Sequence, residues 1–345
     1  MVSHFKGSIL FTIIALALGG WLGWHYTGSF EGVLATIWIC AVLAILEVSI
    51  SFDNAAVNAT VLRHMDPLWQ QRFLTWGIVI AVFGMRIIFP LLIVAIAAHL
   101  GPIEALQLAL NEPDKYAEIL KGAHVGLMGF AGTFLGMVGL KYFFDSEKEV
   151  DWIATIEAPL KRVANIEAVE IGILLLAIYF TSRFVPQEEV TTFLVASLFG
   201  LVTFIGVEVI GHILEAPQEV TGAAAKTGLG AFLYLEVLDA SFSFDGVIGA
   251  FALSTNLFVI AVGLGIGAMF VRSFTIFFVR NGTMSEYRYL EHGAFYAILA
   301  LAGIMFVSTF YHVPEVVTGA IGAVLIGIAF VSSVRINKAE ATGGK

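Results

Sequence analysis

The sequence predicts an all-α polytopic membrane protein, with about ten transmembrane helices in two inverted-topology halves. Three observations support this prediction. Hydrophobic residues make up 59% of the 345 residues and charged residues only 13%, about half the charged fraction of a soluble domain. Long apolar runs recur along the whole chain. An acidic motif inside one of these runs returns in nearly the same form inside another.

Each predicted span is an apolar run close to the roughly 20 residues that a helix needs to cross the hydrocarbon core. The first run follows Lys6 and ends in the aromatic residues Trp21, Trp24 and Tyr26, as a span ending at the membrane interface does, so we expect it to remain as a helix. The ten runs are residues 8–26, 31–57, 73–99, 123–144, 166–184, 190–214, 228–253, 256–279, 290–311 and 313–334.

The acidic motif lies in the second and the seventh run. Its first copy carries Glu47 and Asp53, and its second carries Asp239 and Asp245; in each copy two serines lie between the acids and a phenylalanine directly precedes the second acid. An odd offset between the two runs means that the second copy enters the membrane from the opposite side, as in inverted-repeat transporters. We therefore predict one integral membrane domain over residues 1–345, with a first half at 1–185 and a second half at 186–345.

The basic residues predict the orientation of the chain. With ten spans, thirteen of the 18 Lys and Arg residues fall on one face of the membrane and three on the other. Cytoplasmic loops carry the excess of Lys and Arg, so we expect both termini in the cytoplasm, beneath a bacterial inner membrane or a plasma membrane. No basic stripe accompanies the net charge of −9, so we expect no nucleic-acid partner. The single cysteine, Cys40, excludes a thiolate metal site.

The motif acids are the candidate ligands of a cation site. Carboxylates at membrane depth are costly and generally mark an ion or substrate pathway. The motif serines can bond the local backbone and weaken a regular helix, and an opened helix would let the acids converge on a cavity. The predicted metal ligands are Glu47, Asp53, Asn54, Asp239 and Asp245, supported by the hydroxyls of Ser49, Ser51, Ser241 and Ser243.

This donor set favours a hard divalent cation. Carboxylate, amide and hydroxyl oxygens suit Mn²⁺, Ca²⁺ or Mg²⁺, and no prosthetic group is implied. Four carboxylates would overcharge a site for one such ion, and we expect Arg86 and Arg272, each in the run after its motif, to offset the excess. The alternative is that Asp53 with Arg86, and Asp245 with Arg272, form buried ion pairs that only join helices.

Three further titratable residues inside the apolar runs are candidates for a role at the site. Glu236 precedes Asp239 by about one helical turn, and Glu208 and His212 share one face of the sixth run. Glu208 and His212 either supply a ligand or a proton relay coupled to transport, or form a hydrogen-bonded pair near a helix end. We therefore group Glu208, His212 and Glu236 with the two arginines as counter-charge or coupling residues.

At these residues the chain resembles the TerC family of integral membrane proteins, within the wider LysE-like transporter superfamily. The second copy departs from the usual Asp-Ser pattern of that family by reading Asp245-Gly246, which indicates a divergent branch. The resemblance rests on Ser51-Phe52-Asp53-Asn54, on Asp239 with Phe242-Ser243-Phe244-Asp245, on Arg86, Arg272 and Lys141, and on His312-Val313-Pro314.

The resemblance implies export of a metal ion, Mn²⁺ first, with a link to tellurium resistance. It implies the metal ion as substrate, the lipid bilayer as surroundings, and secreted metalloenzymes or the secretion machinery as partners. A second interpretation remains open, a non-transporting membrane protein of envelope stress or tellurite resistance whose buried acids are structural. The sequence lacks HEXXH, GxSxG and Gly-x-Gly-Asp motifs, so we do not expect an enzyme.

Overall fold

Helices make up the regular structure of this chain. The computed structural model describes residues 2–77, 79–146, 148, 150–164, 166, 168–214 and 228–343, and these residues contain no strand. Eight helical segments among them are long and apolar enough to cross a membrane. The predicted class, an all-α polytopic membrane protein, is confirmed.

The elements of the first half include two π-helical segments, labelled η. They are α1 (Val2–Thr27), α2 (Phe30–Ile50), α3 (Phe52–Leu62), α4 (Pro67–Arg72), η1 (Phe73–Gly77), η2 (Ile80–Ile88), α5 (Phe89–Ala97), α6 (Pro102–Asn111), α7 (Pro113–Gly122), α8 (His124–Phe143), α9 (Ala154–Val163) and α10 (Val169–Ser182).

The second half has fewer and longer helices. They are α11 (Val190–Leu214), α12 (Leu229–Ala250), α13 (Leu257–Arg280), α14 (Thr283–Glu286), α15 (Leu290–Ser308) and α16 (Glu315–Gly343).

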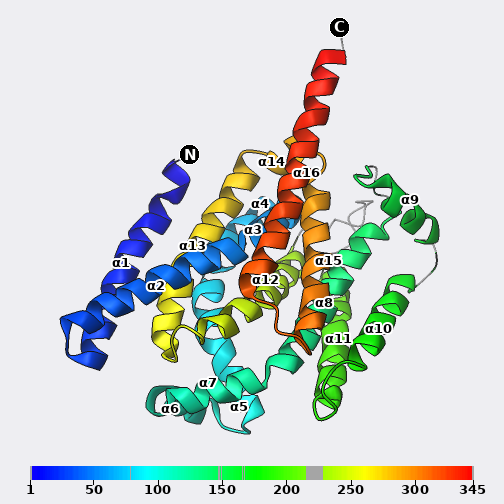
Figure 1. Ribbon diagram of the computed structural model, residues 1–345. Helices are drawn as coiled ribbons and strands as arrows, with labels where there is room; N and C mark the ends of the chain where they lie inside the picture. Colours follow the sequence, from blue (N-terminus) through cyan, green and yellow to red (C-terminus); the bar gives the residue numbers. More distant parts are fainter. Residues whose placement is uncertain are drawn as a thin grey trace.

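The long helices form two groups, with the motif-bearing helices between them (Figure 1). The helices α1, α2 and α13 pack together at one end, and α8, α11 and α15 pack together at the other. The motif-bearing helices α3 and α12 contact each other and both groups. The duplicated acids therefore lie where the two groups meet.

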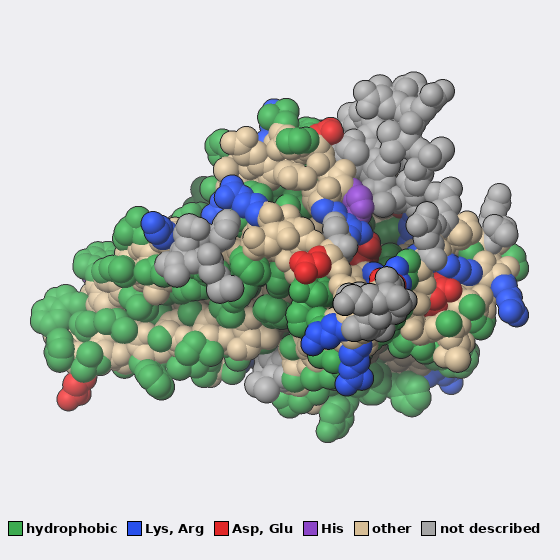
Figure 2. All heavy atoms as spheres, turned by 90° about the horizontal axis from the view of Figure 1, so that it is seen from above, with side chains coloured by type: hydrophobic (Ala, Val, Ile, Leu, Met, Phe, Trp, Pro, Cys, Tyr) green, Lys and Arg blue, Asp and Glu red, His purple; other side chains and the backbone are tan. Residues whose placement is uncertain are grey.

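Both ends of the described chain lie on one side of the bundle. The start of α1 and the end of α16 point the same way in Figure 1. The view onto that side, in Figure 2, shows apolar side chains covering the end of the molecule formed by α1 and α2, with Lys and Arg side chains scattered over this face. Termini on one side agree with an even number of spans, while the compartment that they face stays a prediction.

All ten predicted runs coincide with helical structure, but not all as single long helices. The eight membrane-length segments belong to α1, α2, η2 with α5, α8, α11, α13, α15 and α16. The other two helices are α10, which has only 14 residues, and α12, which carries three acidic residues. The inverted relation of the two halves stays a prediction.

The two copies of the motif have different backbones. In the first copy the helix is interrupted at Ser51, where α2 ends and α3 begins with φ −97° and ψ 16°. In the second copy α12 runs without a break from Leu229 to Ala250. The expected opening of the helix is therefore found only in the first copy. Ser241 instead donates its hydroxyl to the Val237 carbonyl, 2.9 Å away, a bond that a continuous helix accommodates.

Candidate cation site

A small cavity lies at the centre of the bundle, beside the motif helices. Its volume is about 40 Å³, which exceeds the space that a single water needs. The elements around it are α2, α3, α12, α13 and the two π-helical segments. Its polar lining consists of Glu47, Asn54, Asn58, Arg86, Asp239, Arg272 and Thr275.

Glu47 and Arg86 form a buried ion pair at this cavity. The guanidinium of Arg86 bonds the Glu47 carboxylate and the Ala81 carbonyl of the same π-helical segment. The Ser51 hydroxyl donates to the same Glu47 oxygen at 3.2 Å. Arg86 therefore pairs with Glu47, and the pairing of Arg86 with Asp53 that the sequence suggested is wrong. Glu47 lies six residues earlier than Asp53, on α2.

Asp239 of α12 joins the second copy of the motif to the first. Its Oδ1 accepts a hydrogen bond from the Asn54 amide at 2.6 Å and a longer one from the Asn58 amide at 3.4 Å. Within the described structure, the side-chain oxygens of both asparagines are buried and lack a hydrogen-bond partner. Two acceptor oxygens therefore remain unsatisfied next to a carboxylate.

Asn58 was not among the residues predicted from the sequence. It follows Asn54 by four residues on α3, so both amides project from one face of this helix. Both side chains are buried. The signal was present in the sequence as a second asparagine at helical spacing within an apolar run.

Asp53 lies away from the cavity lining. It occupies the first turn of α3, where its Oδ1 accepts the Asn54 backbone N–H at 2.9 Å. Its other oxygen faces α16, because a Cβ placed on Gly322 would stand 2.5 Å from Asp53 Oδ2. A carboxylate in the first turn of a helix is stabilised by the free N–H groups there. The structure therefore gives Asp53 a contact with α16 and a place at a helix start.

Arg272 lines the cavity from α13 and is held by backbone. Its Nε donates to the Leu74 carbonyl of η1 at 2.9 Å, and a terminal guanidinium nitrogen donates to the same oxygen. Its expected partner was Asp245. The side chains of Asp245 and His212 lie outside the described residues, so the predictions on them stay untested.

The remaining predicted residues fall at different places. Ser51 binds Glu47, Ser241 and Ser243 are buried in α12, and Ser49 is exposed with its hydroxyl on the Ile45 carbonyl. Glu208 forms an ion pair with Lys141 at the end of α8. Both of these residues line a second, larger cavity of about 480 Å³.

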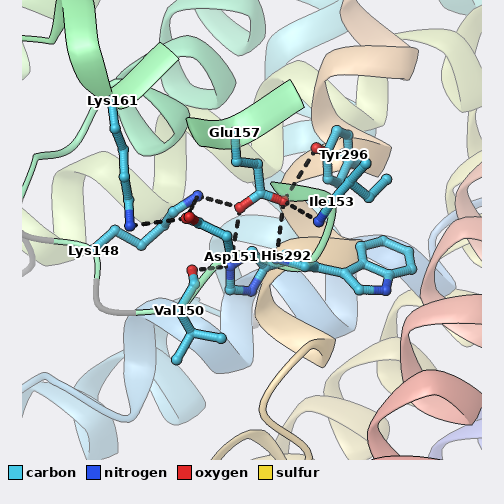
Figure 3. Close-up of polar contacts among 9 residues, drawn as sticks. Lys148, Val150, Asp151, Ile153, Glu157, Lys161, His292 and Tyr296 are labelled. Carbon is cyan, nitrogen blue, oxygen red and sulfur yellow. Dashed lines mark hydrogen bonds and ion pairs between the residues drawn. The ribbon is translucent and has the colours of Figure 1, made fainter. Parts of the chain in front are cut away.

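That second cavity borders a polar clasp built on Glu157 (Figure 3). The Glu157 carboxylate accepts bonds from Lys148, from the Ile153 backbone at 3.0 Å and from the Tyr296 hydroxyl at 3.2 Å, and His292 Nε2 lies 3.4 Å away. Burial alone would raise the pKa of Glu157. The hydrogen bond from the Ile153 backbone and the Lys148 ammonium together outweigh this effect of burial, so the pKa of Glu157 lies below its ordinary value. The clasp thus fastens α9 to α15.

The charges around the central cavity balance. Glu47 and Asp239 contribute two negative charges, and Arg86 and Arg272 contribute two positive ones. The described residues include no group of three or more His, Cys, Asp or Glu side chains placed to hold a metal. The oxygen donors at the cavity are therefore two carboxylates, one of them paired with Arg86, and two side-chain amides.

Comparison with known proteins gives one match. The family described as "Protein of unknown function (DUF475)" matches residues 52–340. No curated protein and no solved structure matches the chain. The matched range includes α3 and α12, and with them Asn54, Asn58 and Asp239.

Proposed function

The chain belongs to the DUF475 family, and we propose that it carries a divalent metal cation across the membrane by alternating access. Its site would be the central cavity, with Glu47, Asn54, Asn58 and Asp239 as ligands. One observation carries the proposal: two buried amide oxygens without partners lie beside the carboxylate of Asp239. Leaving buried acceptors unsatisfied costs about 1–3 kcal/mol each, and a cation between them would remove that cost.

The donor chemistry supports a hard cation. Two carboxylates and two amide oxygens, from α2, α3 and α12, are the oxygen ligands preferred by Mn²⁺, Ca²⁺ and Mg²⁺. The resemblance to the TerC family makes Mn²⁺ the first candidate. Export from the cytoplasm, a bacterial inner or plasma membrane location, and supply of Mn²⁺ to secreted metalloenzymes form part of this proposal.

Arg86 supplies the feature that lets such a site exist without its ion. Its guanidinium neutralises Glu47 at the place where a cation would bind. The π-helical geometry of η2 also gives Arg86 a second partner, the Ala81 carbonyl, and such π segments occur frequently at functional sites. Exchange of the guanidinium for a cation on Glu47 would define two states of the site, as alternating access requires.

A second candidate is favoured by the same ion pair. Glu47 is already paired with Arg86, and Asp239 already accepts two amide bonds. In this second candidate the buried polar groups join helices and have no other role. The protein would then be a non-transporting membrane component, for example in envelope stress or tellurite resistance. In this case substitutions at the cavity would change the protein level but not metal handling.

Cellular manganese content separates the two candidates. Cells expressing the wild type, Asp239→Asn or Asp53→Asn at matched protein levels are grown in high Mn²⁺, and their metal content is measured. We expect the wild type to lower the Mn content, Asp239→Asn to fail, and Asp53→Asn to retain activity because Asp53 lies outside the cavity lining. Equal Mn content in wild-type and vector-only cells would refute the proposal.

A further inference from the structure

Among the residues that the structure describes, one buried acid near the cavity has no charged partner. Glu236 on α12 is 8% exposed, and its Oε1 has no hydrogen-bond partner within the described structure. No described Lys, Arg or His side chain forms an ion pair with it. Glu47 makes a useful contrast, because it is also buried yet bonds Arg86 and Ser51. Of these two buried glutamates, Glu47 therefore has a charged partner, and the described structure shows none for Glu236.

The surroundings of Glu236 are mostly apolar. A Cβ placed on Gly77 of η1 would stand 2.9 Å from Glu236 Oε1, so the carboxyl packs closely on this π-helical segment. Leu62, Leu235 and Phe73 belong to the apolar cluster between α3, α12 and η1. An ionised carboxylate in such a place lacks the solvation or pairing that it needs.

The nearby polar and charged groups offer it no direct neutralisation. On its own helix, Asp239 lies one turn away with a charge of the same sign. From α3 comes the amide of Asn58, bonded to Asp239. On α13, the guanidinium of Arg272 donates its hydrogen bonds to the Leu74 carbonyl. On α4, Arg72 lies over the ring of Trp69.

We propose that Glu236 is the proton-binding group of the carrier: it holds a proton in this conformation and releases it when a cation occupies the cavity. This inference rests on the function proposed above. Because Glu236 is one helical turn from Asp239, two positive charges at that ligand would disfavour a proton on its neighbour. Metal and proton then compete for the site, and this competition makes transport an exchange.

The step balances in atoms and charge. The O–H bond of protonated Glu236 breaks, its electron pair stays on the carboxylate, and the proton passes to water in the cavity. Binding of the cation adds two positive charges and release of the proton removes one. The site therefore gains one net positive charge. The proton returns when the cation leaves.

Linked proton release tests the inference. Mn²⁺ is titrated into purified, detergent-solubilised protein in weak buffer at several pH values near neutrality, with protons counted by an indicator. Relative to the wild type, Glu236→Gln is expected to release about one proton fewer per Mn²⁺. For the same reason, the factor by which its apparent dissociation constant for Mn²⁺ falls with each pH unit is expected to be about tenfold smaller than that of the wild type. Glu112→Gln, which removes an exposed carboxylate paired with Lys115 and outside both cavities, is expected to behave as the wild type.

The outcomes distinguish failure of the proton-coupling role of Glu236 from failure of the proposed metal transport. Saturable Mn²⁺ binding with the same proton release in wild type and Glu236→Gln overturns the coupling role and leaves the carrier proposal standing. Absence of Mn²⁺ binding in the wild type overturns both.

A second measurement needs no variant. Infrared difference spectra of wild type, with glutamate carboxyls labelled by ¹³C, are expected to lose the band of a protonated glutamic acid when Mn²⁺ is added. Retention of all protonated-glutamate signal upon binding overturns the inference even if Glu236→Gln fails to fold.

Discussion

The carboxylate of Asp239 accepts a 2.6 Å hydrogen bond from the side-chain amide of Asn54, across a sequence separation of 185 residues. This bond joins α3, which carries the end of the first acidic motif, to α12, which carries the second. It places the two copies at one cavity, as the repeat in the sequence suggested. It also shows that the first copy contributes an amide to this contact and not its aspartate.

The amide of Asn58 is expected to contribute to cation affinity. Replacing Asn58 by Leu removes an oxygen next to Asp239 and a bond to that carboxylate. Loss of a group that orients a metal ligand typically costs 10–100-fold in affinity, so we expect Mn²⁺ binding to weaken by at least about tenfold. Calorimetric titration measures this change. Ser49→Ala, whose hydroxyl lies on the exposed side of α2, serves as the control and should bind as the wild type does.

Arg86 is expected to stabilise the protein through Glu47. The Arg86→Gln variant leaves the Glu47 carboxylate buried without its charged partner, which typically costs about 3–5 kcal/mol in free energy of unfolding. We expect the melting temperature in detergent to fall clearly.

The double variant Glu47→Gln/Arg86→Gln separates the charge effect from a packing effect. With both charges removed, most of the lost stability should return. A double variant that is as unstable as the sum of its two single variants would show that the ion pair is not the cause.

Gly267 is expected to control the contact between α13 and α2. A Cβ at this position would stand 2.4 Å from Glu47 Cβ and 2.9 Å from the Ala44 carbonyl oxygen. Gly267→Ala should therefore separate the two helices at a cost of about 1–3 kcal/mol, together with reduced Mn²⁺ binding at Glu47. Gly327→Ala on α16 is the matched control, because its Cβ would meet no atom within 4 Å. The stability of that control should be unchanged or slightly raised.

The Glu157 clasp is expected to lose its contribution to stability in acid. The pKa of Glu157 is lowered on folding, so its contribution is fully present above the ordinary value of 4.5 and is lost as the pH falls through the lower folded pKa. The melting temperature of Glu157→Gln should lie below that of the wild type at neutral pH. The difference should shrink below about pH 4.5.

A surface variant checks this assignment. Glu112→Gln removes an exposed carboxylate whose Lys115 partner is also exposed, and such pairs contribute little. Its melting temperature should follow the wild type at every pH. A difference in melting temperature between Glu157→Gln and the wild type that stays constant into strong acid would contradict the stabilising role given to the Glu157 carboxylate.

The sequence was sufficient for the class of fold because membrane spans are encoded locally. Apolar runs of fixed length predict helices in a bilayer, and all ten runs are helical in the structure. The irregular geometry of residues 73–88 was not predictable in the same way. The π-helical segments η1 and η2 contact residues far away in the sequence, such as Arg272, which bonds the Leu74 carbonyl, and the local sequence does not reveal such contacts.

The candidate site could be predicted in part. Glu47, Asn54, Asp239, Arg86 and Arg272 do line one cavity. Pairing was not predictable, because Glu47 and Asp53 are six residues apart and would lie about 120° apart around a regular helix. The break at Ser51 sends Glu47 toward η2 and Asp53 toward α16.

Mn²⁺ titration of purified protein tests the central claim most directly. Wild-type protein and Asp239→Asn are compared by calorimetry, with Asp53→Asn as a control of equal charge change. The account predicts saturable binding of one Mn²⁺ by the wild type and by Asp53→Asn, and at least about tenfold weaker binding by Asp239→Asn. Equal affinities for wild type and Asp239→Asn, or no saturable binding by a folded wild type, would contradict it.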